Sequence, residues 1–185
     1  MARCSSVGST RPLRLDDAVV LAALLAENRT FLAPWQPARP DAYFTEEGQR
    51  AAVATSLAQQ ASDIAVPLVI QDDVGAVVGA VTLQSIIRGA FQSCSVGYWI
   101  AESAQGHGLA TAAVGEAVAV AFDRLRLHRV QAETLTANQP SQRVLERLGF
   151  AEYGRAASYL HIAGAWQDNV LYQLITPTPE RVIVP

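Results

Sequence analysis

The stretch Gln105-Gly106-His107-Gly108-Leu109-Ala110 constrains this chain most, because two glycines stand directly before a long Ala/Val-rich segment. Glycine lets the main chain approach a ligand closely and adopt positive φ angles. The pattern over residues 109–124 predicts a helix, and the unpaired N–H groups of its first turn would face this loop at the positive end of the helix dipole. The stretch therefore predicts a pyrophosphate site and a cofactor that carries a nucleotide.

The same stretch nearly matches the Gly-x-Gly-x-x-Gly/Ala fingerprint of dinucleotide-binding enzymes. Glu133 follows at roughly the distance of the acid that binds a ribose in those enzymes. However, residues 101–104 separate the glycines from the expected strand 96–100, Thr111 takes the third small position, and no strand-helix repeats follow Leu135. A nicotinamide-dinucleotide enzyme stays open as an alternative.

Composition limits the class of protein. With 185 residues, 50% of them hydrophobic, the chain is long and apolar enough for one domain with its own core. The cysteines and histidines are scattered, so we expect neither a metal site nor a disulfide. A net charge of −3 with no run of basic residues argues against direct nucleic-acid binding. No signal or membrane-spanning pattern is evident, and we expect a cytoplasmic protein without membrane contact.

The order of predicted elements changes along the chain. The first half predicts a strand over 10–15, a helix over 16–28, a proline-rich loop over 31–40 and a second helix over 45–60. An antiparallel meander follows, with strands over 64–71, 76–86 and 94–101. The second half predicts a strand-helix-strand unit over 94–101, 109–124 and 129–135, in which the two strands are parallel. A helix over 141–148 and two antiparallel strands over 152–159 and 168–175 follow. We therefore predict a mixed α/β sheet in a single domain over 10–176, with a flexible N-terminus (1–9) and a C-terminal tail (177–185).

Several motifs at compatible positions resemble the GCN5-related N-acetyltransferase (GNAT) family, and the RimJ/RimL subgroup that acetylates ribosomal protein N-termini is the most similar. The general family motifs are Gln105-x-x-Gly108-x-Ala110, Asn138-x-x-Ser141 and Leu148-Gly149-Phe150. The subgroup motifs are Asn28-Arg29-x-Phe31-Leu32-x-Pro34-Trp35-x-Pro37, Arg88-Gly89-x-Phe91, Gly97-Tyr98 and Tyr159-Leu160-x-Ile162-x-Gly164-x-Trp166-x-Asp168.

The resemblance implies a GNAT-type fold in which two parallel strands splay apart to admit the pantetheine arm of acetyl-CoA. It implies transfer of the acetyl group to the α-amine of a protein, a ribosomal one, by direct attack without an acyl-enzyme. The residues expected to bind the cofactor are Trp99, Ile100, Ala101, Gln105, Gly106, His107, Gly108, Leu109, Ala110, Thr111, Asn138 and Ser141.

Asn138 and Ser141 lie three residues apart at a predicted helix start, so both side chains can face the same side. Taken alone, they also fit an ordinary N-cap and first turn. The resemblance places Asn138 on the cofactor arm and Ser141 near the sulfur, where either its hydroxyl or a relayed water would protonate the thiolate.

The general base stays open. Two positions that are often acidic in this subgroup hold Ser95 and Ser158, which leaves the carboxylates of Glu102, Glu133 and Asp168, or a water. Our catalytic candidates are accordingly Ser141, Asn138 and Glu102.

The residues expected to contact the acceptor are Trp35, Tyr43, Arg88, Tyr159 and Asp168. A peptide α-amine has a pKa of about 7.7–8.0 against about 10.4 for lysine, which favours a protein N-terminus over a side-chain amine. A small amine such as an antibiotic or polyamine, and a non-catalytic acyl-CoA-binding or ribosome-assembly module, stay open as alternatives. The protein is expected to be a monomer or a homodimer.

Overall fold

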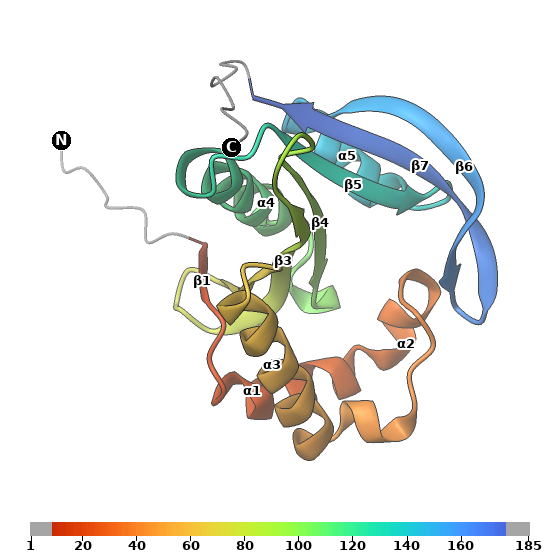
Figure 1. The fold of residues 1–185 in the computed structure, drawn as a ribbon. Coiled ribbons are helices and arrows are strands. Elements are labelled where there is room, and N and C mark those ends of the chain that lie inside the picture. Colours follow the sequence, from red (N-terminus) through yellow and green to blue (C-terminus); the bar gives the residue numbers. More distant parts are fainter. Residues whose placement is uncertain (1–8, 177–185) are drawn as a thin grey trace, which may run out of the picture.

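A single seven-stranded sheet organises the protein (Figure 1), for which a computed structural model describes residues 9–176. The strand order is β1-β2-β3-β4-β5-β7-β6, and every neighbouring pair is antiparallel except β4 and β5. The strands are β1 (Thr10–Pro12), β2 (Val66–Gln71), β3 (Val77–Ile87), β4 (Ser93–Ile100), β5 (Arg129–Leu135), β6 (Ala151–Ile162) and β7 (Ala165–Ile175). Apart from Ser9, the two predicted flexible ends lie outside the described residues.

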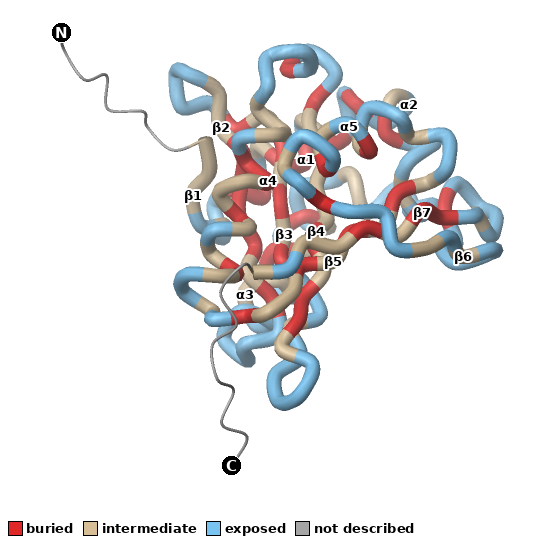
Figure 2. The backbone as a smooth tube through the Cα atoms, turned by 90° about the horizontal axis from the view of Figure 1, so that it is seen from above, coloured by how far each residue is buried: buried red, intermediate tan, exposed pale blue. Residues whose placement is uncertain are grey.

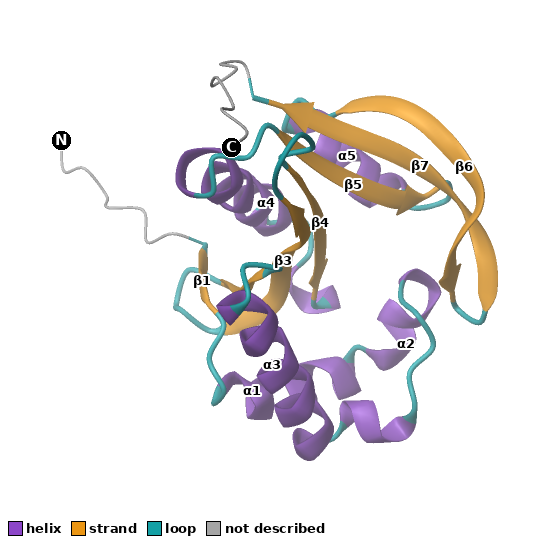
Figure 3. Ribbon diagram, viewed as in Figure 1, coloured by secondary structure: helices purple, strands orange, loops and turns teal. Residues whose placement is uncertain are grey.

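Helices cover both faces of the sheet (Figure 3). The α-helices are α1 (Asp17–Glu27), α2 (Arg29–Leu32), α3 (Glu46–Ala61), α4 (Leu109–Ala119) and α5 (Gln139–Arg147). Shorter helical turns are η1 (Ala33–Trp35), η2 (Asp41–Phe44) and η3 (Glu102–Ala104), and a π-helical turn, η4 (Val120–Arg124), continues α4. Among the described residues, no helix has the length and apolar character needed to cross a membrane.

Two hydrophobic clusters hold these layers together. The larger lies between α4, α5 and the sheet, and the smaller lies between α1, α3 and the other face. Consecutive residues of β2 show the division, because Leu68 and Ile70 belong to the larger cluster and Val69 to the smaller. Figure 2 shows the buried segments gathered along the central strands, whereas the tip of the β6–β7 hairpin is exposed.

Local sequence signals account for most element boundaries. The Thr45 hydroxyl accepts a hydrogen bond from the Gly48 N–H at 3.1 Å and caps α3, a helix predicted over 45–60. Gly149 has a φ of 83° and follows the end of α5, a helix predicted over 141–148. The first strand is shorter than predicted, because the Arg14 N–H donates to the Asp17 carboxylate at 2.8 Å and turns the chain into α1.

The proline-rich stretch differs from the prediction of a loop without regular structure. Helix α2 and turn η1 occupy residues 29–35, and Pro34 lies in the first turn of η1, where its missing N–H is not needed. Prolines after η1 then keep the chain extended until η2. This arrangement places Trp35 beside the open end of β4.

The parallel pair β4–β5 is joined only at its beginning. Register pairs join Ser93 to Arg129, Cys94 to Val130 and Ser95 to Gln131, and no pair follows although both strands continue. The predicted mixed sheet, with a meander followed by a strand-helix-strand unit whose parallel strands splay apart, is confirmed.

Gly79 keeps β3 close to the open end of β4, and we expect Gly79→Ala to destabilise the fold. A Cβ at this position would stand 2.3 Å from the Trp99 carbonyl oxygen and 3.0 Å from the Ile100 Cα, both backbone atoms that can move only with β4. The free energy of unfolding should fall by about 1–3 kcal/mol, measured by chemical denaturation. Gly154→Ala is the matched control, since a Cβ there meets nothing nearer than a Leu171 side-chain carbon at 3.9 Å. Equal stability of the two variants would contradict this view of Gly79.

Candidate active site

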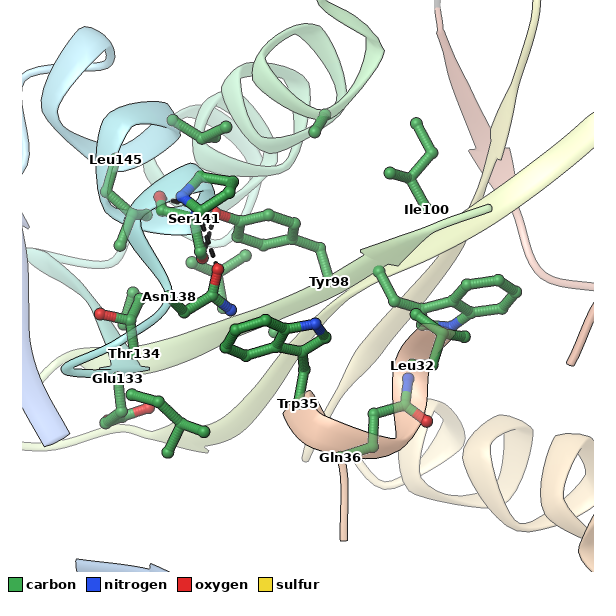
Figure 4. Close-up of a pocket in the computed structure, with 18 of the residues that line it drawn as sticks. Leu32, Trp35, Gln36, Tyr98, Ile100, Glu133, Thr134, Asn138, Ser141 and Leu145 are labelled. Carbon is green, nitrogen blue, oxygen red and sulfur yellow. Dashed lines mark hydrogen bonds between the residues drawn. The ribbon is translucent and has the colours of Figure 1, made fainter. Parts of the chain in front are cut away.

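A cavity of about 720 Å³ opens where β4 and β5 part. The unpaired ends of both strands line it, together with the glycine loop before α4, the start of α5, η1 and the β6–β7 hairpin. The Ala163 N–H, in the turn of that hairpin, donates to the Gln36 carbonyl oxygen at 3.0 Å, so two segments far apart in sequence close one side. Figure 4 shows Trp35 reaching into this space from the side opposite α5.

The glycine loop has the geometry that an anion site requires. Gly106 and Gly108 have φ angles of 82° and 77°, in the left-handed region, and nothing lies within 4 Å of where a Cβ would stand on either. Gly108 immediately precedes α4, and no side chain caps the N–H groups of the first turn of the helix. The exposed loop thus offers open space and main-chain donors at the positive end of a helix dipole.

Asn138 and Ser141 meet at the start of α5, as their spacing predicts. The Asn138 Oδ1 accepts a hydrogen bond from the Ser141 N–H at 3.2 Å, so Asn138 is indeed the N-cap. This use of the carbonyl oxygen leaves its amide nitrogen for another partner, and both residues line the cavity. The Ser141 Oγ lies 2.8 Å from the Tyr98 hydroxyl (Figure 4).

Glu133 supplies the one carboxylate among the described residues that line the cavity. It lies on β5, two residues beyond the last register pair with β4, and the Ser95 Oγ is 3.3 Å from its Oε1. Burial raises the pKa of Glu133, against the opposing effect of the Ser95 hydrogen bond. A carboxyl group with a raised pKa in a cleft is suited to proton transfer.

The other two candidate carboxylates do not line this cavity. Glu102 is exposed on η3, and its main chain is held by the Asn28 Oδ1, which accepts from the Glu102 N–H at 2.8 Å. Asp168 accepts from the Ser158 N–H at 2.8 Å and fixes the irregular part of β6, where Ser158 has a φ of 47°. Asp168 therefore has a structural task in β6, and its contact with the acceptor stays a prediction.

Arg88 and Tyr43, also expected to contact the acceptor, lie elsewhere. Arg88 follows β3 at the end away from the cavity, where its guanidinium pairs with Asp63 at 2.7 Å and donates to the Leu125 carbonyl oxygen. Tyr43 packs against Phe44 and lines a separate cavity of about 150 Å³ beneath α1 and α3. Both residues thus have their contacts outside the cavity lining.

Some of the remaining predicted residues line the cavity and others do not. Tyr159 is exposed and outside the lining, although burial and the neighbouring charge of Glu133 raise its pKa. Ala101 is buried, and neither Ala101 nor His107 lines the cavity. The predicted residues that do line it are Trp35, Trp99, Ile100, Gln105, Gly106, Gly108, Leu109, Ala110, Thr111, Asn138 and Ser141.

Tyr98 is the main site residue to which the sequence analysis assigned no role. It alternates with Trp99 along β4, so it faces the α5 side of the sheet and reaches Ser141. Burial raises the pKa of Tyr98 to about 12, with the Ser141 hydrogen bond acting in the opposite direction. The motif Gly97-Tyr98 was the available signal, but the contact with α5 depends on tertiary packing.

Comparison with known proteins agrees with this geometry. Residues 10–151 match the model of the acetyltransferase (GNAT) domain. The chain is 36% identical to a probable N-acetyltransferase, YjcK, of Bacillus subtilis, over 92% of this chain and 95% of that protein. It is 36% identical to the [ribosomal protein uS5]-alanine N-acetyltransferase of Escherichia coli, over 89% of this chain and 87% of that protein.

A solved structure shares the whole arrangement. Mycobacterium smegmatis RimJ, in complex with a CoA-disulfide, superimposes with a TM-score of 0.86 at 31% identity, covering 90% of this chain and 80% of that one. A sheet with splayed parallel strands, a glycine loop at a helix start and these sequence matches lead to one assignment, which excludes the dinucleotide-binding alternative. The chain belongs to the GNAT family of acetyltransferases, enzymes that use acetyl-CoA, and its relatives are of the RimJ type.

Proposed function

We propose that this protein transfers the acetyl group of acetyl-CoA to the N-terminal α-amine of a protein, a ribosomal one, in the cytoplasm. The observation that carries the proposal is the continuous cavity that joins the glycine loop to Glu133 past the unpaired ends of β4 and β5. One end of this space suits a pyrophosphate and the other a proton acceptor. Such a site can align an amine with a thioester.

The residues of the loop and of the parted strands fit the cofactor. The N–H groups after Gly108 would hold the pyrophosphate, with Gln105, Gly106 and Thr111 beside it. Trp99 and Ile100 line the cavity where β4 lacks its parallel partner, so their main-chain polar groups would pair with the amides of the arm. Asn138 would bind the same arm through its free amide nitrogen.

Glu133 is the general base of the proposed reaction. The acceptor amine must lose a proton as its nitrogen attacks the thioester carbonyl, and the raised pKa of Glu133 brings this carboxylate nearer to the pKa of an α-amine. Ser95 would orient the carboxylate through its hydrogen bond. Ser141 would serve the departing sulfur at the opposite side.

Direct attack of the amine on the thioester agrees with the burial and the raised pKa of Cys94. Cys94 is buried, does not line the cavity, and has its pKa raised to about 12 by burial, so it is not poised as a nucleophile. The acetyl group would therefore pass from sulfur to nitrogen in one step.

The acceptor is the finer part of the proposal. The 36% identity to an enzyme named for the alanine of ribosomal protein uS5 supports a protein N-terminus. The lower pKa of an α-amine, about 7.7–8.0, supports it as well, because a usable neutral fraction exists near neutral pH. A small amine is the second candidate, since a single carboxylate in a cavity can also receive a short amine.

An acceptor panel tests the proposal directly. Purified protein with acetyl-CoA is offered peptides with free N-termini, the same peptides with blocked N-termini and one lysine, and a polyamine, and products are measured by mass spectrometry. We expect acetylation of the free N-termini only. Turnover of the polyamine alone would favour the second candidate, and CoA binding without thiol release from any acceptor would favour a non-catalytic module.

Glu133→Gln should lower kcat by about 10²–10⁴-fold while leaving the CoA dissociation constant within about twofold, because the amide cannot accept the proton. The wild-type rate should fall as the pH drops through the raised pKa of Glu133, since only the ionised carboxylate acts as a base. This limb of the pH-rate profile should vanish in the variant. Glu102→Gln is the matched control, because that exposed carboxylate does not line the cavity. A larger loss in the control would transfer the role of base to Glu102.

Gly108→Ala should weaken CoA binding by about tenfold, because an L residue at this positive φ costs about 1–2 kcal/mol and lets the loop relax. Gly89→Ala is the matched control: Gly89 has a φ of 71°, equally open surroundings, and lies outside the cavity lining. Calorimetry with CoA should show an affinity change for the first variant alone. Unchanged binding by Gly108→Ala would remove the loop from the proposed site.

A further inference from the structure

We propose that Tyr98 is a positioning residue that aims the Ser141 hydroxyl at the departing sulfur, so that the two hydroxyls act as one unit. This inference rests on the proposed function and deepens it. The two hydroxyl groups come from elements far apart in the sequence, since Tyr98 lies on β4 and Ser141 in the first turn of α5. Both line the cavity (Figure 4).

The geometry gives the Tyr98 hydroxyl two partners on one residue. It lies 2.8 Å from the Ser141 Oγ and 3.2 Å from the Ser141 carbonyl oxygen. A tyrosine hydroxyl has one proton to donate and can also accept. The phenol ring is held in place because Tyr98 packs against the larger hydrophobic cluster.

These contacts allow two proton arrangements with the same heavy-atom positions. In the first, Tyr98 donates to the Ser141 carbonyl oxygen and accepts from the Ser141 Oγ–H, so the serine proton is engaged by Tyr98. In the second, Tyr98 donates to the Ser141 Oγ, and the serine proton is free to point at a ligand. A negative charge that develops in the cavity favours the second arrangement, which rotates hydroxyls only.

The reaction supplies such a charge. The amine nitrogen forms a bond to the carbonyl carbon, the carbon–sulfur bond breaks, and its electron pair moves to sulfur, while the amine proton goes to Glu133. The thiolate then accepts a hydrogen bond from the Ser141 Oγ–H, which is itself polarised by Tyr98. Hydrogen bonds of this kind, to a charged acceptor in a chain of donors, are stronger than a single neutral one.

The pair acts as a hydrogen-bond donor and not as a net acid. Burial raises the pKa of Tyr98 to about 12, whereas a thiol has a reference pKa of about 8.5, so the phenol does not give up its proton to the thiolate. Tyr98 stays protonated throughout, and the thiolate takes its proton from solvent when CoA leaves. The unit therefore needs no separate step to restore it.

Tyr98→Phe tests the inference, because it removes the hydroxyl and keeps the ring. We expect kcat to fall by about 10–100-fold, with the CoA dissociation constant and the KM for acetyl-CoA within about twofold. Ser141→Ala should cause a similar fall. The double variant should be no slower than Ser141→Ala by more than about twofold, since the phenol acts only through the serine.

Tyr172→Phe is the matched control. The Tyr172 side chain is also buried, and its hydroxyl lies 3.5 Å from the Glu146 Oε1 on α5, but it does not line the cavity. This variant should keep wild-type kcat. A comparable loss of kcat in Tyr172→Phe would show that the effect comes from packing under α5 and would overturn the inference.

A second measurement does not depend on the acceptor. The thiol of CoA bound to the wild type should ionise at lower pH than that of free CoA, followed by thiolate absorbance, and Ser141→Ala should abolish the difference. Three results would each overturn the inference while leaving the proposed function intact. They are an unshifted pKa of the CoA thiol bound to the wild type, a wild-type kcat in Tyr98→Phe, and a loss of kcat from Tyr98→Phe that is equal with and without Ser141. Failure of the wild type to acetylate any acceptor would overturn both.

Discussion

The early end of the β4–β5 ladder is the constraint on which the rest of the structure depends. Three register pairs hold the two parallel strands together, and beyond Ser95 and Gln131 each strand leaves main-chain groups without a partner in the other. Unpaired main-chain groups are costly in a protein interior unless something else pairs with them. The gap therefore provides space for an extended ligand and leaves main-chain groups with which such a ligand can form hydrogen bonds.

The surrounding layers keep this gap open without loosening the sheet. Antiparallel partners hold each strand on its outer side, β3 along β4 and β7 along the full length of β5. On one face, Ala113 and Ala117 of α4 are fully buried, and their small side chains let the helix lie close to the strands. This close packing brings the first turn of α4 and the glycine loop to the mouth of the gap. The site thus lies where the parallel ladder ends early, and the neighbouring layers stabilise it from both sides.

The chemistry follows from which side chains the two strands deliver to the gap. The unpaired end of β5 places Glu133 on the cavity, and alternation along β4 turns Tyr98 towards α5. The same packing explains why three residues expected to contact the acceptor lie outside the cavity lining. Asp168 is used to hold the irregular part of β6, Arg88 pairs with Asp63 at the far end of β3, and Tyr43 packs beneath α1 and α3. A polar residue in a suitable motif can serve the fold just as well as the site.

The sequence by itself determined most of the elements and the glycine loop, because both depend on neighbours along the chain. Thr45 and Asn138 cap their helices, Gly149 ends α5, and Gly106 and Gly108 take the left-handed conformations that their spacing before a helix predicts. Only the tertiary structure placed Glu133 on the cavity and left Glu102 and Asp168 outside its lining, and only it brought Tyr98 to Ser141, 43 positions away. Burial and long-range contact set the pKa and the partners of a side chain, and neither can be read from local spacing.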